Sequence, residues 1–234
     1  MNEPQKERLL ALTERLLARD REDWRTVRSV WQPKIDQGDL DAKVCLARLI
    51  LCYVSAPKRV EDQMREYLQT AAQAGHADAI YWTCRWGKKR DKDADGLLLR
   101  AAELGSRGAQ RDLGALFATG DWSGPKDPIS ALHWYRLAAE RGHDDAQYNL
   151  GFMYILGEGT EADVPEGLHW LHRAAMQGDW SARHLLADLY RNGYYGVTKN
   201  VEEAKRWEHL QSVADLKIRN KKKRICLDEL RESH

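Results

Sequence analysis

Apolar residues recur three and four positions apart along most of the chain, which is the spacing that places them on one face of an α-helix. The segment after Ala146 shows the pattern clearly, because Leu150, Met153 and Tyr154 follow at these intervals. A small residue, Gly151, lies within the same face and would let a second helix approach closely. Four other segments repeat the arrangement, and each begins at an anchoring alanine. The five anchoring alanines are Ala42, Ala79, Ala109, Ala146 and Ala182.

A glycine lies four residues before each anchoring alanine, and these glycines recur at intervals of 30 to 37 residues. In four of the five cases an Ala-Ala pair comes just before the glycine, as Ala138 and Ala139 do before Gly142. Glycine is common just past the end of a helix because it adopts the left-handed conformation without steric cost. Each unit is therefore predicted to contain a helix, a loop, a second helix that carries the alanine pair, and a glycine that ends it.

The loops inside the units have the composition of turns. Gly120, Gly157 and Gly193 each follow a first helix, and each precedes a polar stretch, with a further Pro or Gly in it. The unit near residues 78–107 is degenerate, because its loop is shorter and Thr83 stands where the other units have leucine. We expect this unit to be the least regular of the array.

Two of the units, residues 108–146 and 145–182, resemble the Sel1-like repeat, a relative of the tetratricopeptide repeat with a longer loop. The resemblance is to the bacterial type and covers residues 41–215. It implies an all-α fold, specifically a right-handed superhelical α/α solenoid of stacked helix hairpins.

The two ends differ from the repeats and are predicted to cap the array, since a solenoid needs terminal units with a polar outer face. We expect an N-terminal helical cap over residues 1–38, about five repeat units over residues 39–215, and a C-terminal capping helix with a basic tail over residues 216–234. The helix before Gly38, which carries Trp31, resembles a decayed helix of an incomplete unit.

Charge and composition exclude several classes of protein. The chain has 234 residues and a formal net charge of +1, which argues against a protein built mainly to hold nucleic acid or an anionic membrane. No apolar stretch is long enough for a spanning helix, and the N-terminal segment lacks the pattern of a secretory signal. Cys45 and Cys52 are too far apart on one helix for a disulfide, so we expect reduced thiols in a cytoplasmic protein.

The resemblance also predicts the surface that contacts a partner. In tetratricopeptide-like stacks the first helix of each unit lines a concave groove, and the inward positions are two and six residues after the anchoring alanine. These positions vary while the packing positions repeat, and they combine aromatic and arginine side chains, as contact hot spots do. Ordinary surface variation is the alternative. The predicted partner-binding residues are Arg48, Tyr81, Arg85, Arg111, Tyr148, Phe152, His184 and Asp188.

We expect the groove to take another protein, anchored by the aromatic residues and ion-paired by the arginines. The resemblance implies an adaptor in signalling or secretion, or an immunity protein that captures a toxin. A second candidate surface consists of aromatic residues expected in turns and loops, namely Trp122, Trp180, Tyr194 and Tyr195. Packing in the core is expected for Trp86, Trp134, Trp170 and Trp207.

Catalytic and metal sites are not predicted. His169 and His172 have a spacing that suits zinc, but both stand at positions that recur in other units, and no third ligand follows at a standard spacing. Phosphate-binding loops and nucleophile motifs are missing from the sequence, so we expect no enzyme, no cofactor and no metal.

Two alternative functions remain open. Secreted, cysteine-rich relatives imply a β-lactam-binding or β-lactam-hydrolysing enzyme, although the four cysteines here do not follow the repeat period. An adaptor that binds nucleic acid would use the basic run over residues 217–224.

Overall fold

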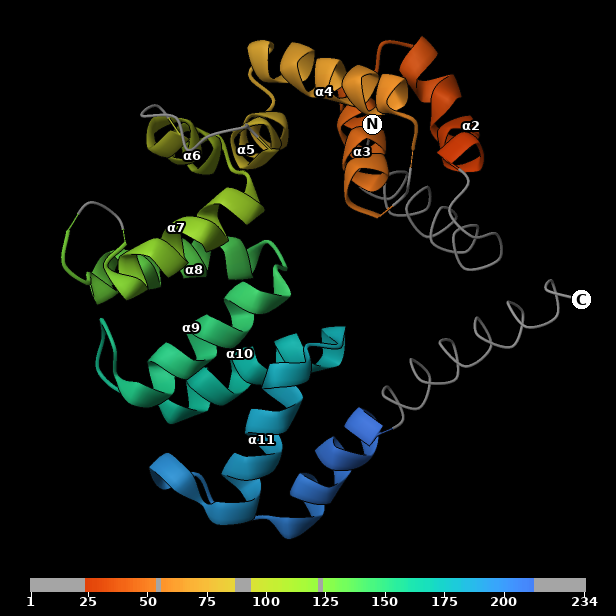
Figure 1. Cartoon of the computed structure of the whole chain (residues 1–234). Coiled ribbons are helices and arrows are strands. Elements are labelled where there is room, and N and C mark those ends of the chain that lie inside the picture. The colour runs from red at the N-terminus through yellow and green to blue at the C-terminus, as the bar shows by residue number, and fades with distance from the viewer. Residues whose placement is uncertain (1–23, 54–55, 87–93, 122–123, 213–234) are drawn as a thin grey trace, which may run out of the picture. The chain divides into compact units, whose positions relative to one another are not determined.

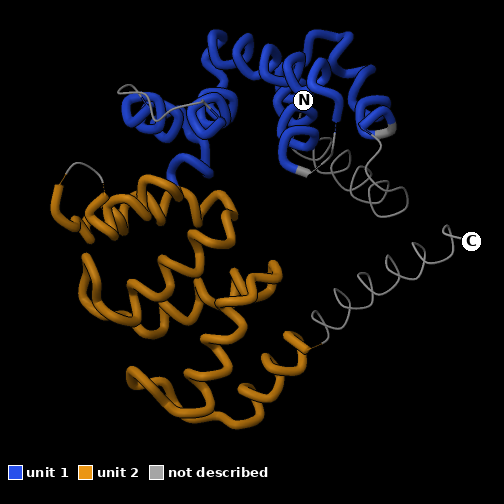
Figure 2. The backbone as a smooth tube through the Cα atoms, in the orientation of Figure 1, with its two compact units in different colours: residues 1–110 blue, residues 111–234 orange. Residues whose placement is uncertain are grey.

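The computed structural model describes residues 24–53, 56–86, 94–121 and 124–212, and within these ranges the secondary structure is helical with no strand. The prediction of an all-α protein is confirmed. The chain divides into two compact units, unit 1 over residues 1–110 and unit 2 over residues 111–234 (Figure 2).

Unit 1 is a succession of helices in which each packs against its neighbour in the chain, from α2 against α3 to α5 against α6 (Figure 1). Its core gathers apolar residues of α2, α3 and α4 around the buried side chains of Trp31, Leu46 and Met64. The helices are α2 (Trp24–Asp36), α3 (Leu40–Tyr53), α4 (Lys58–Gln73), α5 (Ala77–Trp86), α6 (Ala94–Glu103) and the start of α7 (Arg107–Thr119).

Unit 2 continues the same pattern, and α8, α9, α10 and α11 pack in chain order. Its core is formed by apolar side chains on facing helices, among them Leu150, Leu171 and Leu186, which are fully buried. The elements are the rest of α7, α8 (Pro128–Glu140), α9 (Asp144–Leu156), α10 (Val164–Gln177), α11 (Trp180–Asn192), the short 3-10 helix η1 (Tyr194–Gly196) and a helix over residues 201–212.

The repeat skeleton predicted from the sequence is confirmed at its fixed positions. All five anchoring alanines have no exposed surface. The glycine that ends each second helix, called the stop glycine below, has a positive φ, from +79° at Gly38 to +106° at Gly178. L-residues with a side chain rarely adopt this conformation, so the sequence pattern identified the helix ends for a physical reason.

The small residue inside the first helix marks a close helix crossing, as predicted, in the two repeats where this residue is glycine. A Cβ atom on Gly151 of α9 would lie 2.7 Å from the carbonyl oxygen of Gly167 on α10 and 3.0 Å from the backbone nitrogen of Leu171. At the equivalent crossing of α7 with α8, a Cβ atom on Gly114 would lie 2.7 Å from the ring of Tyr135. Glycine therefore sets the separation of the two helices in these hairpins.

Polar contacts that the sequence analysis did not identify fix first helices and second helices of the repeats alike. Asp39, Asp127, Asp163 and Asp179 each accept a hydrogen bond from the backbone N–H three residues later, which caps the helix that follows. Another position, one after the anchoring alanine, donates a side-chain hydrogen bond to the carbonyl of the preceding alanine pair. The donors are Gln110, Gln147 and Arg183, at 3.0, 3.0 and 2.9 Å.

Predictions for the two ends are tested only in part. The helix before Gly38 is present as α2, and Trp31 is buried. Residues 1–23, Trp122, the basic run and the capping helix over residues 216–234 lie outside the described part of the chain. No helix among the described residues is both long and apolar enough to cross a bilayer.

Candidate functional site

The predicted partner-binding residues fall into two sets, one in each unit, and the structure treats them differently. In unit 1, Tyr81 was expected on the contact surface, but it is only 5% exposed. Its ring contacts the backbone at Gly108, where a Cβ atom would lie 2.8 Å from the ring carbon Cε1. Tyr81 therefore packs inside unit 1 and does not present its ring to a partner.

The charges of the two arginines predicted in unit 1 both act on one cysteine. Burial raises the pKa of the Cys52 thiol, while the positive charges of Arg48 and Arg85 act in the opposite direction. Arg48 on α3 is half-buried and Arg85 on α5 is exposed. Cys45, Cys52 and Cys84 are free thiols, as expected.

In unit 2 the predicted arginine is already neutralised. The guanidinium of Arg111 lies 2.7 Å from the carboxylate of Asp112 and 3.7 Å from that of Asp145 on α9. The ion pair expected with a partner is therefore formed within the unit, which changes the predicted charge of this surface.

The aromatic residues of unit 2 form two stacked pairs on the first helices. Tyr148 and Phe152 on α9 are parallel within 1°, with ring centroids 6.4 Å apart. Trp180 and His184 on α11 stack at 5.2 Å and 12°. Trp180 was expected in a turn but is the first residue of α11, with 55% of its surface exposed. Trp180 therefore adds one residue to the predicted partner-binding surface, although the sequence analysis had placed it in a turn.

Asp188 completes this surface. Its carboxylate lies 3.6 Å from the imidazole of His184 and 3.3 Å from the guanidinium of Arg191. We call this surface the α9–α11 face and define it by Arg111, Asp144, Asp145, Tyr148, Phe152, Asp179, Trp180, His184 and Asp188. It contains all the predicted site residues of unit 2.

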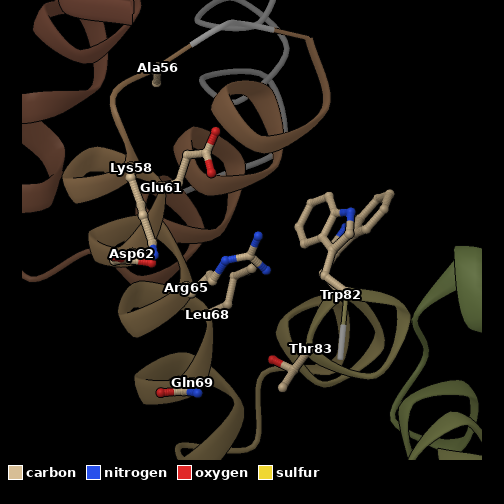
Figure 3. A pocket seen from close by; sticks show the side chains of 10 residues that line it. Ala56, Lys58, Glu61, Asp62, Arg65, Leu68, Gln69, Trp82 and Thr83 are labelled. Carbon is tan, nitrogen blue, oxygen red and sulfur yellow. The ribbon is translucent and has the colours of Figure 1, made fainter. Parts of the chain in front are cut away.

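A groove that the sequence analysis missed lies in unit 1 between α4 and α5 and holds about 620 Å³ (Figure 3). Charged residues of α4, including Lys58, Glu61, Asp62 and Arg65, form one side. The other side carries Trp82 with Trp86 stacked on it, at 4.6 Å and 22°. Because two acidic and two basic groups balance, the groove has an apolar indole wall and no net charge.

The degenerate unit accounts for this groove. The position of Thr83 is occupied by Leu46, Leu113, Leu150 and Leu186 in the other units, and all four leucines are fully buried. Thr83 is shorter and lines the groove, with a buried Oγ1 that has no hydrogen-bond partner among the described residues. The signal was present in the sequence as the loss of a leucine, but it was interpreted only as irregular packing.

The four tryptophans that were predicted to pack in the core differ in how far they are buried. Trp170 and Trp207 are buried, as expected, while Trp134 and Trp86 are half-buried. Tyr194 and Tyr195 are more than half exposed in η1, as expected for residues of a loop.

One histidine of the His-x-x-His pair has structural partners on both ring nitrogens. His172 bonds through Nδ1 to the Leu168 carbonyl at 2.6 Å and through Nε2 to the Tyr190 hydroxyl at 3.3 Å. Both ring nitrogens of this half of the His-x-x-His pair are therefore engaged. Among the described residues, one group has a spacing that would fit a cation, formed by His143, Asp144 and Asp145. Asp145 is shared with Arg111, so this group is part of an ion-pair network.

Comparison with known proteins gives the same architecture. The family model described as the Sel1 repeat matches residues 59–76, 108–143, 144–179 and 180–207. An uncharacterised protein of Neisseria meningitidis is 42% identical over 173 residues, which is 72% of this chain and 34% of that protein. The chitin synthase regulator SKT5 of Saccharomyces cerevisiae is 32% identical over 119 residues, which is 50% of this chain and 17% of the regulator. The chain thus spans well under two thirds of these relatives.

Solved structures agree. A Sel1 repeat protein from Oxalobacter formigenes superposes with a TM-score of 0.67 at 26% identity, and the match covers 82% of this chain and 80% of that one. An immunity protein from Pseudomonas aeruginosa superposes with a TM-score of 0.63 at 19% identity, over 92% of this chain and 84% of that one. At that identity the second likeness concerns the fold alone.

Proposed function

Because the chain belongs to the Sel1 repeat family, we propose that it is a protein-binding scaffold, and more specifically an immunity or adaptor protein of a bacterial toxin or secretion system. A scaffold built from such repeats is consistent with protein–protein interaction. We further propose that it acts in the cytoplasm, where its thiols stay reduced.

The observation that carries the proposal is the pair of aromatic stacks on the α9–α11 face. Core packing accounts for the buried leucines and alanines of α9 and α11, but it leaves Trp180 more than half exposed. Aromatic side chains at such positions supply a large contact area at little cost in conformational entropy, and they dominate the binding energy of protein interfaces. The immunity assignment is supported by the shared fold with the Pseudomonas aeruginosa protein and by analogy with it.

The test uses the protein encoded beside this gene as the partner, purified and titrated against the chain by calorimetry. We expect Tyr148→Ala/Phe152→Ala to weaken binding more than tenfold, because truncation of a hot spot costs about 2 kcal/mol or more. The matched control is Ile129→Ala, which removes an apolar side chain that is 71% exposed on the second helix α8. Binding that survives the double variant while circular dichroism shows an intact fold would refute the site.

The immunity role has its own test. Co-expression of the chain with a toxic neighbouring gene product should restore growth, and the double variant should fail to do so. If the wild-type chain and the double variant both restored growth, protection would not depend on the α9–α11 face.

A further inference from the structure

The arginines in and beside the α9–α11 face form ion pairs or hydrogen bonds within unit 2. Arg111 is paired with Asp112 and Asp145, and Arg191 is paired with Asp188 and with Glu208 of the helix over residues 201–212. A third arginine near the face, Arg183, directs its Nε at the carbonyl of Ala175 at 2.9 Å. These ion pairs also engage Asp145 and Asp188, but six carboxylates stand in and beside the face against the three arginines, so a net negative charge remains. The carboxylates are those of Asp112, Asp144, Asp145, Asp179, Asp188 and Glu208.

A comparison between repeats shows that Asp179 stands at a position where the repeats of unit 1 have a residue that complements an aspartate. At two repeat junctions of unit 1 the residue after a stop glycine contacts the residue before the anchoring alanine of the preceding repeat, and we call this contact the inter-repeat pair. In unit 1 the pair is complementary twice: His76 Nε2 lies 2.9 Å from Asp41, and the Ser106 hydroxyl donates to Asp78 at 2.7 Å.

In unit 2 the same two positions are occupied by Asp179 and Asp145, which carry like charges. Burial raises the pKa of Asp179 above its ordinary value, and the charges of Asp145 and Asp144 raise it further, against the hydrogen bond from Ala182 and the charge of Arg183. Two aspartates therefore stand where unit 1 has complementary pairs, and their like charges are offset only in part, by Arg111 at 3.7 Å from Asp145 and by the charge of Arg183 on Asp179.

Helix capping explains only part of this acidity. One oxygen of Asp179 caps α11, and Asp144 lies in the first turn of α9, where a negative charge is favourable. Asp188 instead lies in the C-terminal half of α11, outside the first turn that a carboxylate would cap, and its carboxylate is 3.6 Å from the imidazole of the Trp180–His184 stack.

We propose that the α9–α11 face selects a cationic segment of its partner protein, with lysine or arginine side chains set between the carboxylates of Asp145, Asp179 and Asp188 and the stacked aromatic rings. This rests on the proposed function, because it assigns the charge of the partner at the same face. Carboxylates give such a segment its ion pairs, and the faces of Tyr148 and Trp180 attract the same cations. The prediction from the sequence that arginines of this chain would pair with an acidic partner is thereby reversed for unit 2.

The test selects peptides from a random 16-residue phage-display library on the full-length chain and measures their affinity by fluorescence anisotropy. We expect the selected sequences to be rich in lysine and arginine around apolar residues. Asp145→Asn/Asp188→Asn should weaken their binding about tenfold, and 0.5 M salt should weaken wild-type binding more than binding to the double variant. The control Glu140→Gln/Glu161→Gln removes two exposed carboxylates outside the face and should change the affinity by less than twofold.

The outcomes separate this inference from the proposed function. Selected peptides that are acidic or neutral, yet lose affinity with Tyr148→Ala/Phe152→Ala, would overturn the cationic assignment and leave the scaffold function standing. Peptides that bind Asp145→Asn/Asp188→Asn and Tyr148→Ala/Phe152→Ala as tightly as they bind the wild-type chain would refute the site itself. Displacement by a synthetic peptide of residues 213–234 would make the chain's own basic segment the occupant and would overturn the assignment to a partner.

Discussion

The close crossing of α9 and α10 predicts that replacing glycine by alanine destabilises the protein at Gly151 but stabilises it at Gly96. Gly151 and Gly96 both lie within helices, and replacing helical glycine by alanine gains up to about 1 kcal/mol of stability from helix propensity. At Gly96 a Cβ atom meets nothing within 4 Å. We therefore expect Gly96→Ala to stabilise the protein by a few tenths to about 1 kcal/mol, less than the full value because the residue lies in the first turn of α6.

At Gly151 the same methyl group has no room. It would lie 2.7 Å from the Gly167 carbonyl oxygen, 2.9 Å from Cγ of Leu171 and 3.0 Å from the backbone nitrogen of Leu171. Two of these atoms belong to the backbone of α10 and cannot rotate away, so the helices must separate. Overpacking of this kind costs about 3 kcal/mol at the upper end, which leaves a net loss of about 2 kcal/mol after the gain in propensity.

The assay is thermal and urea unfolding followed by circular dichroism at 222 nm. A loss of about 2 kcal/mol should lower the Tm of a chain of this length by about 4–8 °C, while Gly96→Ala should raise it slightly. If Gly151→Ala leaves the Tm unchanged or raises it, the two helices are not in the close contact on which the hairpin geometry depends.

Three further predictions concern single residues of unit 2. Asp179→Ser keeps the cap and removes a like charge, so it should stabilise the protein at pH 7. Because the pKa of Asp179 is raised in the folded protein, this gain in stability should shrink as the pH falls from above that pKa towards the ordinary value of 3.8. Urea unfolding midpoints between pH 3 and 7 measure the change. Tyr195 has a φ of +54°, at a position equivalent to Gly159, so Tyr195→Gly should add about 1 kcal/mol and Tyr195→Ala should not, as measured by urea unfolding. Gln147 is fully buried, donates to the Ala139 carbonyl and accepts from Gln177, so Gln147→Leu should cost about 1–3 kcal/mol and lower the Tm more than Gln177→Ala does.

The repeat architecture was predictable because each of its determinants is local. A stop glycine requires a positive φ, an anchoring alanine requires burial, and Gly151 requires a close crossing, so each constraint leaves one residue type at one period. The all-α fold follows from these positions without knowledge of any long-range contact.

The candidate site was less predictable because it depends on pairs from different repeats. Whether Arg111 is available to a partner depends on Asp145 as well as on its sequence neighbour Asp112, and Asp145 lies on another helix more than thirty positions away. The burial of Tyr81 depends on the approach of Gly108 in the next repeat of unit 1. Helical periodicity places a residue on a face, but it does not report what the neighbouring repeat sets against that face.

Thr83 shows a different limit. The sequence revealed that a leucine had been lost, but the effect of a missing side chain depends on whether the neighbours collapse or leave a space. Here α4 and α5 leave a groove.

The most direct test of the account is photo-crosslinking in the native cell with a benzophenone amino acid placed at Phe152, and at Glu140 as the control. The account predicts a crosslink from position 152 to one protein, mapped by mass spectrometry to a stretch rich in lysine or arginine, and none from position 140. A crosslink that forms from position 140 and not from position 152 would contradict recognition through the α9–α11 face.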